Sequence, residues 1–110
     1  MNQYDIYLAD LNPTKGREQR GKRPVLIISN SYENLLDIVT IIPITSKKEA
    51  RRIYPNELLL KDELKVPSIL LCQQIRTISK KRLVKKLTSI DDDKVQKKIV
   101  DILCMRFDSL

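Results

Sequence analysis

Residues 24–29 read Pro-Val-Leu-Ile-Ile-Ser, and residues 38–44 read Ile-Val-Thr-Ile-Ile-Pro-Ile. Each run is rich in β-branched and apolar residues, has the length of a strand and is bounded by polar residues, so each predicts a β-strand. Because both runs are continuously apolar rather than alternating, we expect the two strands to be covered on both faces. That pattern is typical of a small barrel or a tightly curled sheet.

Further strands are predicted on both sides of these two runs. Residues 4–11 alternate weakly, with Ile6 and Leu8 on one face. Residues 68–75 predict a fourth strand, and residues 58–60 predict a short one. The first part of the chain therefore reads as a series of short strands.

The end of the chain has the period of a helix. Apolar residues recur at helical spacing over residues 91–107, with lysines and an aspartate on the other side. The aspartates at 91–93 crowd the first turn, where the helix dipole favours anions, and Ser89 and Asp92 fit a capping pattern. Three adjacent helical side chains point in different directions, so a helix start is favoured over a metal cluster. A shorter helix is predicted over residues 80–85.

The composition excludes several classes of protein. Of the 110 residues, 42% are hydrophobic, which allows one core and excludes a disordered chain. We expect a single domain over residues 1–110. The absence of histidine removes imidazole general bases, imidazole metal ligands and the triads that depend on them.

The two cysteines and the N-terminus indicate where the protein resides. Cys72 and Cys104 both follow a leucine in apolar surroundings, which favours buried thiols in a reducing compartment over a disulfide. The residues after Met1 do not resemble a signal peptide, and no apolar stretch approaches the ~18 residues of a membrane span. We therefore expect a cytoplasmic protein.

The net charge of +7 is concentrated in three segments. Residues 14–23 hold five basic side chains and one acid, residues 80–86 hold five, and residues 47–52 hold four beside one glutamate. Such a concentration points to a polyanionic partner. Gly16 and Gly21 let backbone N–H groups of the first segment approach a phosphate closely, whereas the second segment fits a solvated face equally well.

Arg23 and Thr45 are the candidate reacting pair. If Ser29 pairs with Ile38 in a hairpin, Arg23 lies opposite Ile44, one residue from Thr45. A guanidinium suits two phosphoryl oxygens and a hydroxyl adds a further donor, so the pair can stabilise the charge of a pentacoordinate phosphorus. RNA supplies its own nucleophile, the 2′-hydroxyl, and such a site needs no metal. In the alternative interpretation, both are ordinary strand-end and turn residues.

Five short motifs occur in order across nearly the whole chain. They are Asp5-Ile6-Tyr7, Asp10-Leu11-Asn12-Pro13, Gly16-x-Glu18-Gln19-x-Gly21-x-Arg23-Pro24-Val25, Pro43-Ile44-Thr45 and Gln74-Ile75-Arg76-Thr77. Together these motifs resemble the MazF/PemK family of toxin endoribonucleases. The third and fifth motifs in combination are the specific ones.

The resemblance implies a mainly β fold with α, namely a small SH3-like antiparallel β-barrel of the CcdB/MazF kind with a C-terminal α-helix. It implies a homodimer that acts as the toxin of a type II toxin–antitoxin system and cleaves single-stranded RNA at short sequences. Metal-independent cleavage, without any cofactor, gives a 2′,3′-cyclic phosphate and a 5′-hydroxyl. The implied partner is a MazE-like antitoxin whose acidic, flexible tail covers the RNA site.

The resemblance also assigns roles to individual residues. Arg23 and Thr45 take the catalytic positions, and because arginine keeps its proton, Arg23 is expected to clamp the phosphoryl group and donate a proton. The expected RNA-binding residues are Glu18, Gln19, Arg20, Ser46, Gln74 and Arg76. Two positions depart from the family pattern: Tyr4 replaces a glycine before the first strand, and Gln73 stands where an acid often occurs.

Two other functions compete with the nuclease. One is a CcdB-like, non-nuclease gyrase poison, but residues 106–110 lack the Trp-Gly-Ile-type ending of that relative. The other is a non-catalytic SH3-like nucleic-acid-binding module. The chain has only four tyrosines and one phenylalanine, mostly outside the basic loop, which weakens a base-stacking platform.

Overall fold

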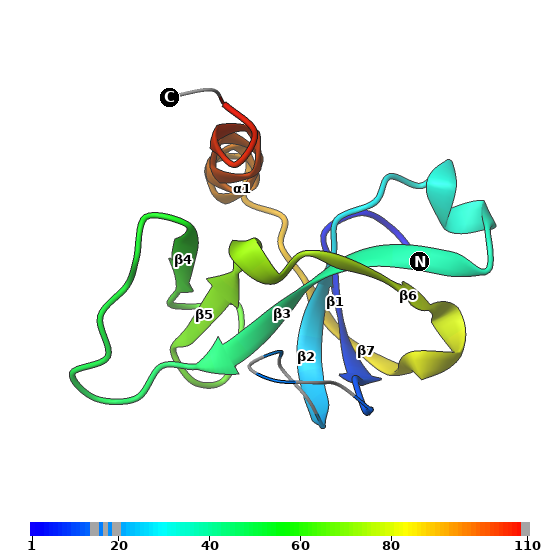
Figure 1. The fold of residues 1–110 in the computed structure, drawn as a ribbon, viewed down its shortest axis with the longest axis horizontal. Coiled ribbons are helices and arrows are strands. Elements are labelled where there is room, and N and C mark those ends of the chain that lie inside the picture. Colours follow the sequence, from blue (N-terminus) through cyan, green and yellow to red (C-terminus); the bar gives the residue numbers. More distant parts are fainter. Residues whose placement is uncertain (14–15, 17, 19–20, 109–110) are drawn as a thin grey trace.

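The computed structural model describes residues 1–13, 16, 18 and 21–108. These residues form seven strands, three short 3-10 turns and one α-helix (Figure 1). The strands are β1 (Asp5–Asp10), β2 (Lys22–Ile27), β3 (Ile38–Ser46), β4 (Glu57–Leu60), β5 (Ser68–Leu71), β6 (Arg76–Ser79) and β7 (Leu83–Ser89). The turns are η1 (Glu33–Leu35), η2 (Cys72–Gln74) and η3 (Lys80–Arg82), and the helix is α1 (Asp93–Met105).

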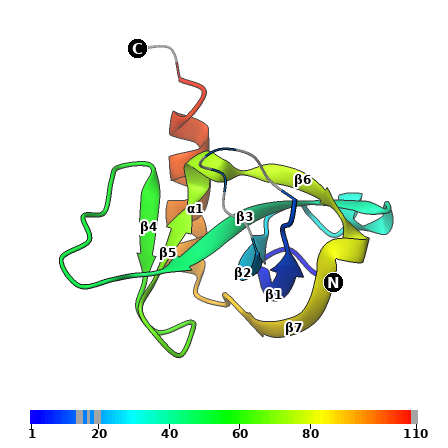
Figure 2. The ribbon, with the colours of Figure 1, turned by 60° about the horizontal axis from the view of Figure 1, so that its bottom comes forward.

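All strand pairs are antiparallel, and the sheet curls around β3 (Figures 1 and 2). The strand order is β4-β5-β3-β2-β1-β7, with β6 added beside β3. Within the described part of the chain the ladder does not close, so the sheet is barrel-like rather than a sealed barrel. The predicted fold class, a small antiparallel β structure with a C-terminal helix, is confirmed.

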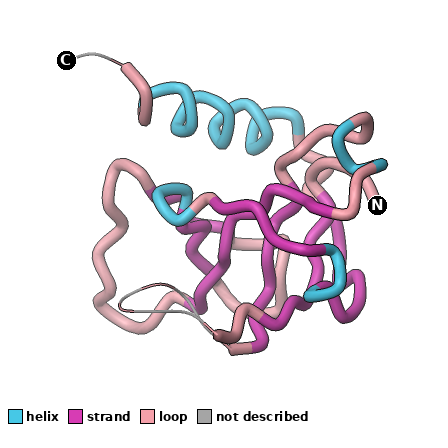
Figure 3. Tube along the Cα trace, turned by 45° about the vertical axis from the view of Figure 1, so that its right-hand side comes forward, coloured by secondary structure: helices cyan, strands magenta, loops and turns pink. Residues whose placement is uncertain are grey.

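The sheet is buried on both faces, as the continuous apolar runs predicted. One face carries the helix-side core, which includes Leu26, Ile42 and Ile99 of α1. The other carries the opposite core, which includes Val25 and Ile41. Figure 3 shows α1 lying along one side of the strands. Alternate residues of β2 and β3 therefore feed two separate apolar layers.

β1 keeps the alternation that was predicted for it. Ile6 is in the helix-side core, whereas Tyr7 packs against the opposite core and Ala9 belongs to it. Leu8 is only half-buried. The pairing of β1 with β2 is regular from Ile6 to Asp10, while its pairing with β7 shifts register between Ile6 and Tyr7 and again between Leu8 and Ala9.

The fourth strand predicted over residues 68–75 forms only over its first part, as β5. The chain then turns at η2, and a further strand that was not predicted, β6, begins at Arg76. β5 pairs with residues 44–46 of β3, and β6 pairs with residues 38–41. The break faces Pro43, which has no N–H to donate to a ladder. The short strand predicted over residues 58–60 is confirmed as β4.

The helix predicted over residues 80–85 is also wrong. Only the turn η3 forms there, and the chain continues as β7, which pairs along the free side of β1 from Ala9 to Asp5. Tertiary pairing thus overrides the weak local preference.

The C-terminal helix is confirmed with slightly tighter bounds than predicted. Asp92 is its N-cap and accepts a 2.8 Å hydrogen bond from the Lys94 amide. Ser89 is not part of the cap, because its hydroxyl donates to Asp5 at 2.7 Å. The prediction of two buried thiols is wrong for Cys104, which is exposed on this helix, and right for Cys72. No helix among the described residues is long and apolar enough to cross a membrane.

Candidate functional site

Arg23 lies near the start of β2 and Thr45 near the end of β3, two strands that pair with each other. The observed register pairs Val25 with Pro43 and Ile27 with Ile41. Carried two residues further toward the ends of the strands, it sets Arg23 opposite Thr45 itself. The predicted pairing of Ser29 with Ile38 is therefore off by one residue, although the antiparallel pairing of these two strands is confirmed.

The cause of this shift lies in the connection after β2. The amides of Ile28 and Ser29 both donate to the Thr40 carbonyl, at 2.9 and 3.4 Å, so the strand ends there. The Ser29 hydroxyl donates to Asn34 at 2.6 Å, which ties it to the η1 loop. Ile38 pairs with Ser79 on the other side of β3.

Strand alternation puts the side chains of Arg23 and Thr45 on the face of the opposite core. Arg23 is two residues from Val25, and Thr45 is four residues from Ile41, and both of these apolar residues belong to that core. Arg76 pairs directly with Ile41 and so shares the same face. Two guanidiniums and a hydroxyl, from three strands, thus belong to one sheet face, with Arg76 four residues along β3 from the level of Thr45.

Arg76 makes a single loose ion pair in the described part of the chain. Its Nη1 lies 3.8 Å from a carboxylate oxygen of Glu18, and that nitrogen is buried without a hydrogen-bond partner among the described residues. Glu18 itself is exposed. The pair links Glu18 of the basic 14–23 segment to β6.

The other predicted RNA-binding residues lie in different parts of the chain, and two of them are not described by the structure. Ser46 is exposed at the end of β3, next to Thr45, and pairs with Ser68. Gln74 ends η2 and precedes β6. Gln19 and Arg20 lie outside the described residues.

The base of the loop at residues 12–21 is held together by backbone contacts. The Gly21 amide donates to the Asn12 side chain at 3.0 Å, and Gly21 has the positive φ of 81° that favours glycine. Arg82 donates to the carbonyls of Asp10, at 3.3 Å, and Asn12. This half-buried basic residue therefore binds the protein's own backbone at the base of the loop.

Other cations of the 80–86 segment also bind the protein itself. The Lys80 amino group donates to the Asn34 carbonyl, and Lys86 lies 3.4 Å from Asp5. Burial raises the pKa of Asp5, but the Asn2 amide, Ser89 and Lys86 together outweigh it and leave that pKa below its ordinary value. The segment is thus partly structural, a role that neither the polyanion-binding nor the solvated-face interpretation predicted.

A cleft of about 510 Å³ opens at the same strand ends. Arg23 and Thr45 border it together with Pro24 and Ile44, and the connection at residues 63–66 and the Leu87–Thr88 part of β7 form its other wall. The strand ends that carry the candidate pair are therefore accessible rather than covered by the core.

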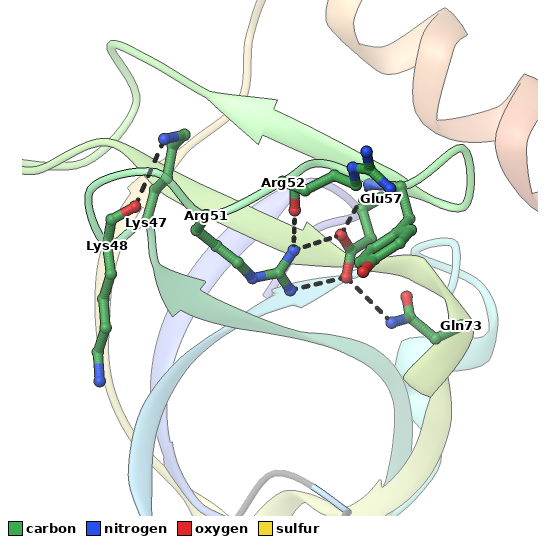
Figure 4. A network of polar contacts seen from close by, with 7 residues as sticks. Lys47, Lys48, Arg51, Arg52, Glu57 and Gln73 are labelled. Carbon is green, nitrogen blue, oxygen red and sulfur yellow. Dashed lines mark hydrogen bonds and ion pairs between the residues drawn. The ribbon is translucent and has the colours of Figure 1, made fainter.

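Sequence reasoning missed one group beside this site. Glu57, at the start of β4, is buried and accepts hydrogen bonds from Arg51, Tyr54 and Gln73 (Figure 4). The hydrogen bonds from Arg51, helped by the other two donors, lower the pKa of Glu57 to about 2 although burial opposes this. The sequence signal that could have found it is an acidic residue directly before the apolar run 58–60, which follows the basic segment 47–52.

Both departures from the family pattern have structural counterparts. Tyr4 has a φ of 72°, a conformation in which glycine is strongly favoured. The amide of Gln73 donates to Glu57 at 3.2 Å, which a carboxylate at that position could not do.

Comparison with known proteins decides the family. The family described as PemK-like, MazF-like toxin of type II toxin-antitoxin system matches residues 2–102. The chain belongs to this family. An endoribonuclease MazF from Staphylococcus saprophyticus is 39% identical over 99 residues, which cover 87% of this chain and 82% of that protein.

Solved structures of PemK-like and MazF-like proteins share the fold. MazF from Deinococcus radiodurans superposes with a TM-score of 0.81 at 23% identity, over 96% of this chain and 94% of that one. An endoribonuclease in complex with its cognate antitoxin, from a mycobacterial species, gives a TM-score of 0.79 at 20% identity over 100% of this chain and 99% of that one.

Proposed function

We propose that this chain is the endoribonuclease toxin of a type II toxin–antitoxin system and that it cleaves single-stranded RNA at short, specific sequences. The observation that carries the proposal is the register of β2 against β3, which supports Arg23 and Thr45 as neighbours when it is carried two residues past its last pair. The cleft that both residues border supports the same pairing. Family membership and the MazF relative named an endoribonuclease support the same reaction.

The proposed reaction is a transesterification within the RNA. The 2′-oxygen attacks the adjacent phosphorus and forms a P–O2′ bond while the P–O5′ bond breaks. The 2′-hydroxyl loses its proton and O5′ gains one, so neither water nor a cofactor is consumed. The products carry a 2′,3′-cyclic phosphate and a 5′-hydroxyl, and the reaction requires no metal-bound nucleophile.

Each residue of the pair supplies hydrogen-bond donors to the phosphorane. Arg23 holds two phosphoryl oxygens with its planar fork, and Thr45 adds a hydroxyl. Donors of this kind, fixed before the reaction, stabilise the charge that develops in the transition state. A guanidinium offers N–H donors and no acceptor, so Arg23 acts as a clamp that can also give a proton to the leaving O5′, and it does not act as the base.

RNA-binding residues surround the pair in this proposal. Arg76 offers a buried donor that no hydrogen bond fills among the described residues, and Glu18 and Gln74 present acceptors suited to base edges. Ser46 extends the same surface, and Gln19 and Arg20 are proposed as further RNA-binding residues because of their positions in the family motif. Exposed base edges of a single strand can be read by such side chains.

The proposed protein partner is an antitoxin with an acidic, flexible tail. The concentration of basic residues around the site suits such a tail, and affinity should weaken with added salt. A solved relative in complex with its cognate antitoxin supports this arrangement.

We also infer a homodimer. Tyr32 and Leu35 of the η1 region are 83% and 81% exposed, and Leu36 is also exposed, which is a surface that a second copy of the chain can cover. Analytical ultracentrifugation of the Leu35→Asp variant, beside the unaltered chain, tests this by a loss of the dimer.

One assay separates this function from its competitors. The purified chain is incubated with a long synthetic RNA in EDTA, and cuts are mapped by primer extension. Discrete cuts support the proposal. Binding without cuts indicates a nucleic-acid-binding module, and gyrase inhibition with intact RNA indicates a CcdB-like poison.

A further inference from the structure

One buried carboxylate joins two segments that flank the Arg23–Thr45 face. The side chain of Glu57 is 2% exposed and accepts two hydrogen bonds from Arg51, at 2.8 and 2.9 Å. It also accepts from the Tyr54 amide at 3.0 Å and from the Gln73 side chain at 3.2 Å. We call these four residues the Glu57 node (Figure 4).

The node connects the β3–β4 loop to η2. Arg51 and Tyr54 belong to residues 47–56, which begin directly after Ser46, and Gln73 lies in η2. The guanidinium of Arg51 also lies 5.9 Å from the centre of the Tyr54 ring, which adds a second contact within the loop. From the other side, Arg106 at the end of α1 donates to the Gln73 carbonyl at 2.7 Å.

Each joined segment carries groups suited to RNA. Figure 4 shows Lys48 directed away from the node, and Lys48 and Arg52 are both exposed. On the other segment, Gln74 and Arg76 follow Gln73 directly. Arg51, by contrast, binds the carboxylate of Glu57, so its charge holds the conformation of the loop.

Stability alone does not account for this arrangement. A buried ion pair loses much of its attraction to desolvation, and apolar residues of similar size are often as stabilising. A bidentate arginine–carboxylate contact does fix geometry, because both side chains are held in one orientation. The node therefore has the properties of a device that sets the position of the loop.

We propose that Glu57 is a positioning residue for RNA. It holds the 47–56 loop and η2 at a fixed separation. The cations of the loop and the residues 74–76 that follow Gln73 can then contact the same RNA strand. This inference rests on the proposed function. Glu57 itself touches no substrate.

The test is the double variant Arg51→Met with Glu57→Leu. Replacing both partners leaves no unpaired buried charge, so the melting temperature should stay near that of the unaltered chain. The loop is no longer tied, and we expect KM for a cleavable RNA oligonucleotide to rise about tenfold with kcat within about twofold, the signature of lost binding rather than lost chemistry.

A matched control removes the same charges elsewhere. Lys97 and Asp101 form an exposed 3.2 Å pair on α1, so Lys97→Met with Asp101→Leu changes the charge equally. This control should leave KM unchanged. A similar rise of KM in the control would overturn the positioning role.

A second variant tests the same inference if the double variant does not fold. Gln73→Met releases η2 from the node and leaves the Arg51–Glu57 pair intact, and KM should rise about threefold. A folded variant of either kind with unaltered KM would overturn the inference. If the unaltered chain leaves RNA uncut, the proposed function fails instead, so the two failures are distinguishable.

Discussion

Arg23, near the start of β2, lies opposite Thr45, near the end of β3, once the observed register is carried two residues past its last pair. The two residues are far apart in the chain, and they meet because β2 and β3 run antiparallel through the centre of the sheet. Alternation sends both side chains to the face that also carries Arg76. This face thus carries the donors of Arg23 and Thr45 at the cleft and that of Arg76 further along β3.

Removal of either member of this pair should abolish cleavage without unfolding the protein. For Arg23→Ala and Thr45→Ala separately, we expect kcat to fall by about 10²-fold or more, because each change removes donors to the transition state. Quenched time courses of cleavage of a short RNA oligonucleotide measure the fall in kcat, and circular dichroism checks that each variant is folded.

Lys98→Ala, an exposed change on α1, is the matched control for a lost cation and should keep full activity. Near-normal cleavage by either Arg23→Ala or Thr45→Ala would refute the assigned roles.

Stability should depend on pH through Glu57. Its pKa is about 2 in the folded protein, against an ordinary value of 4.5, so the unfolded chain takes up the proton first as pH falls. The contribution is fully present above pH 4.5 and is lost as pH falls through about 2. The lowered pKa of Asp5 acts in the same direction.

Urea titrations between about pH 5 and about pH 2 measure this loss, which for Glu57 amounts to at most about 3 kcal/mol. The double variant Arg51→Met with Glu57→Leu should show a shallower decline than the unaltered chain. Identical slopes would argue against a charged, hydrogen-bonded Glu57 in the folded protein.

Tyr4 should be a strained position. Its φ of 72° disfavours any side chain with a Cβ, so Tyr4→Gly should be more stable than Tyr4→Ala by about 1 kcal/mol. Both variants lose the ring that packs against the helix-side core, so their difference isolates the backbone. Thermal or urea unfolding measures it.

Tyr32 provides the opposite case, because its φ is −68°. There the alanine variant should be the more stable of the two. An alanine variant at position 4 as stable as the glycine variant would contradict the positive φ.

The central strands could be predicted from the sequence because their signal is local. The apolar runs at 24–29 and 38–44 have strand length and no competing period, and they form β2 and β3. The end of β5 at Leu71 and the separate strand β6 could not be predicted, since both depend on which parts of β3 remain free to pair. β7 likewise exists because β1 offers an edge.

The candidate site likewise has features that could be predicted from the sequence and others that depend on the folded sheet. Arg23 and Thr45 could be brought together by counting along a hairpin, with an error of one residue caused by the loop after Ile27. The Glu57 node could not be predicted, because the bond between Glu57 and Gln73 joins segments whose distance only the folded sheet defines. Arg82 looked like a surface cation for the same reason.

The most direct measurement uses a DNA oligonucleotide with a single ribonucleotide on the 5′ side of a mapped cleavage position. In EDTA, we predict one cut after that ribonucleotide, with a 2′,3′-cyclic phosphate detected by mass spectrometry, and an intact all-deoxy control. Cleavage of the all-deoxy strand, or a product with a 3′-hydroxyl, would contradict attack by the substrate's own hydroxyl at the Arg23–Thr45 pair.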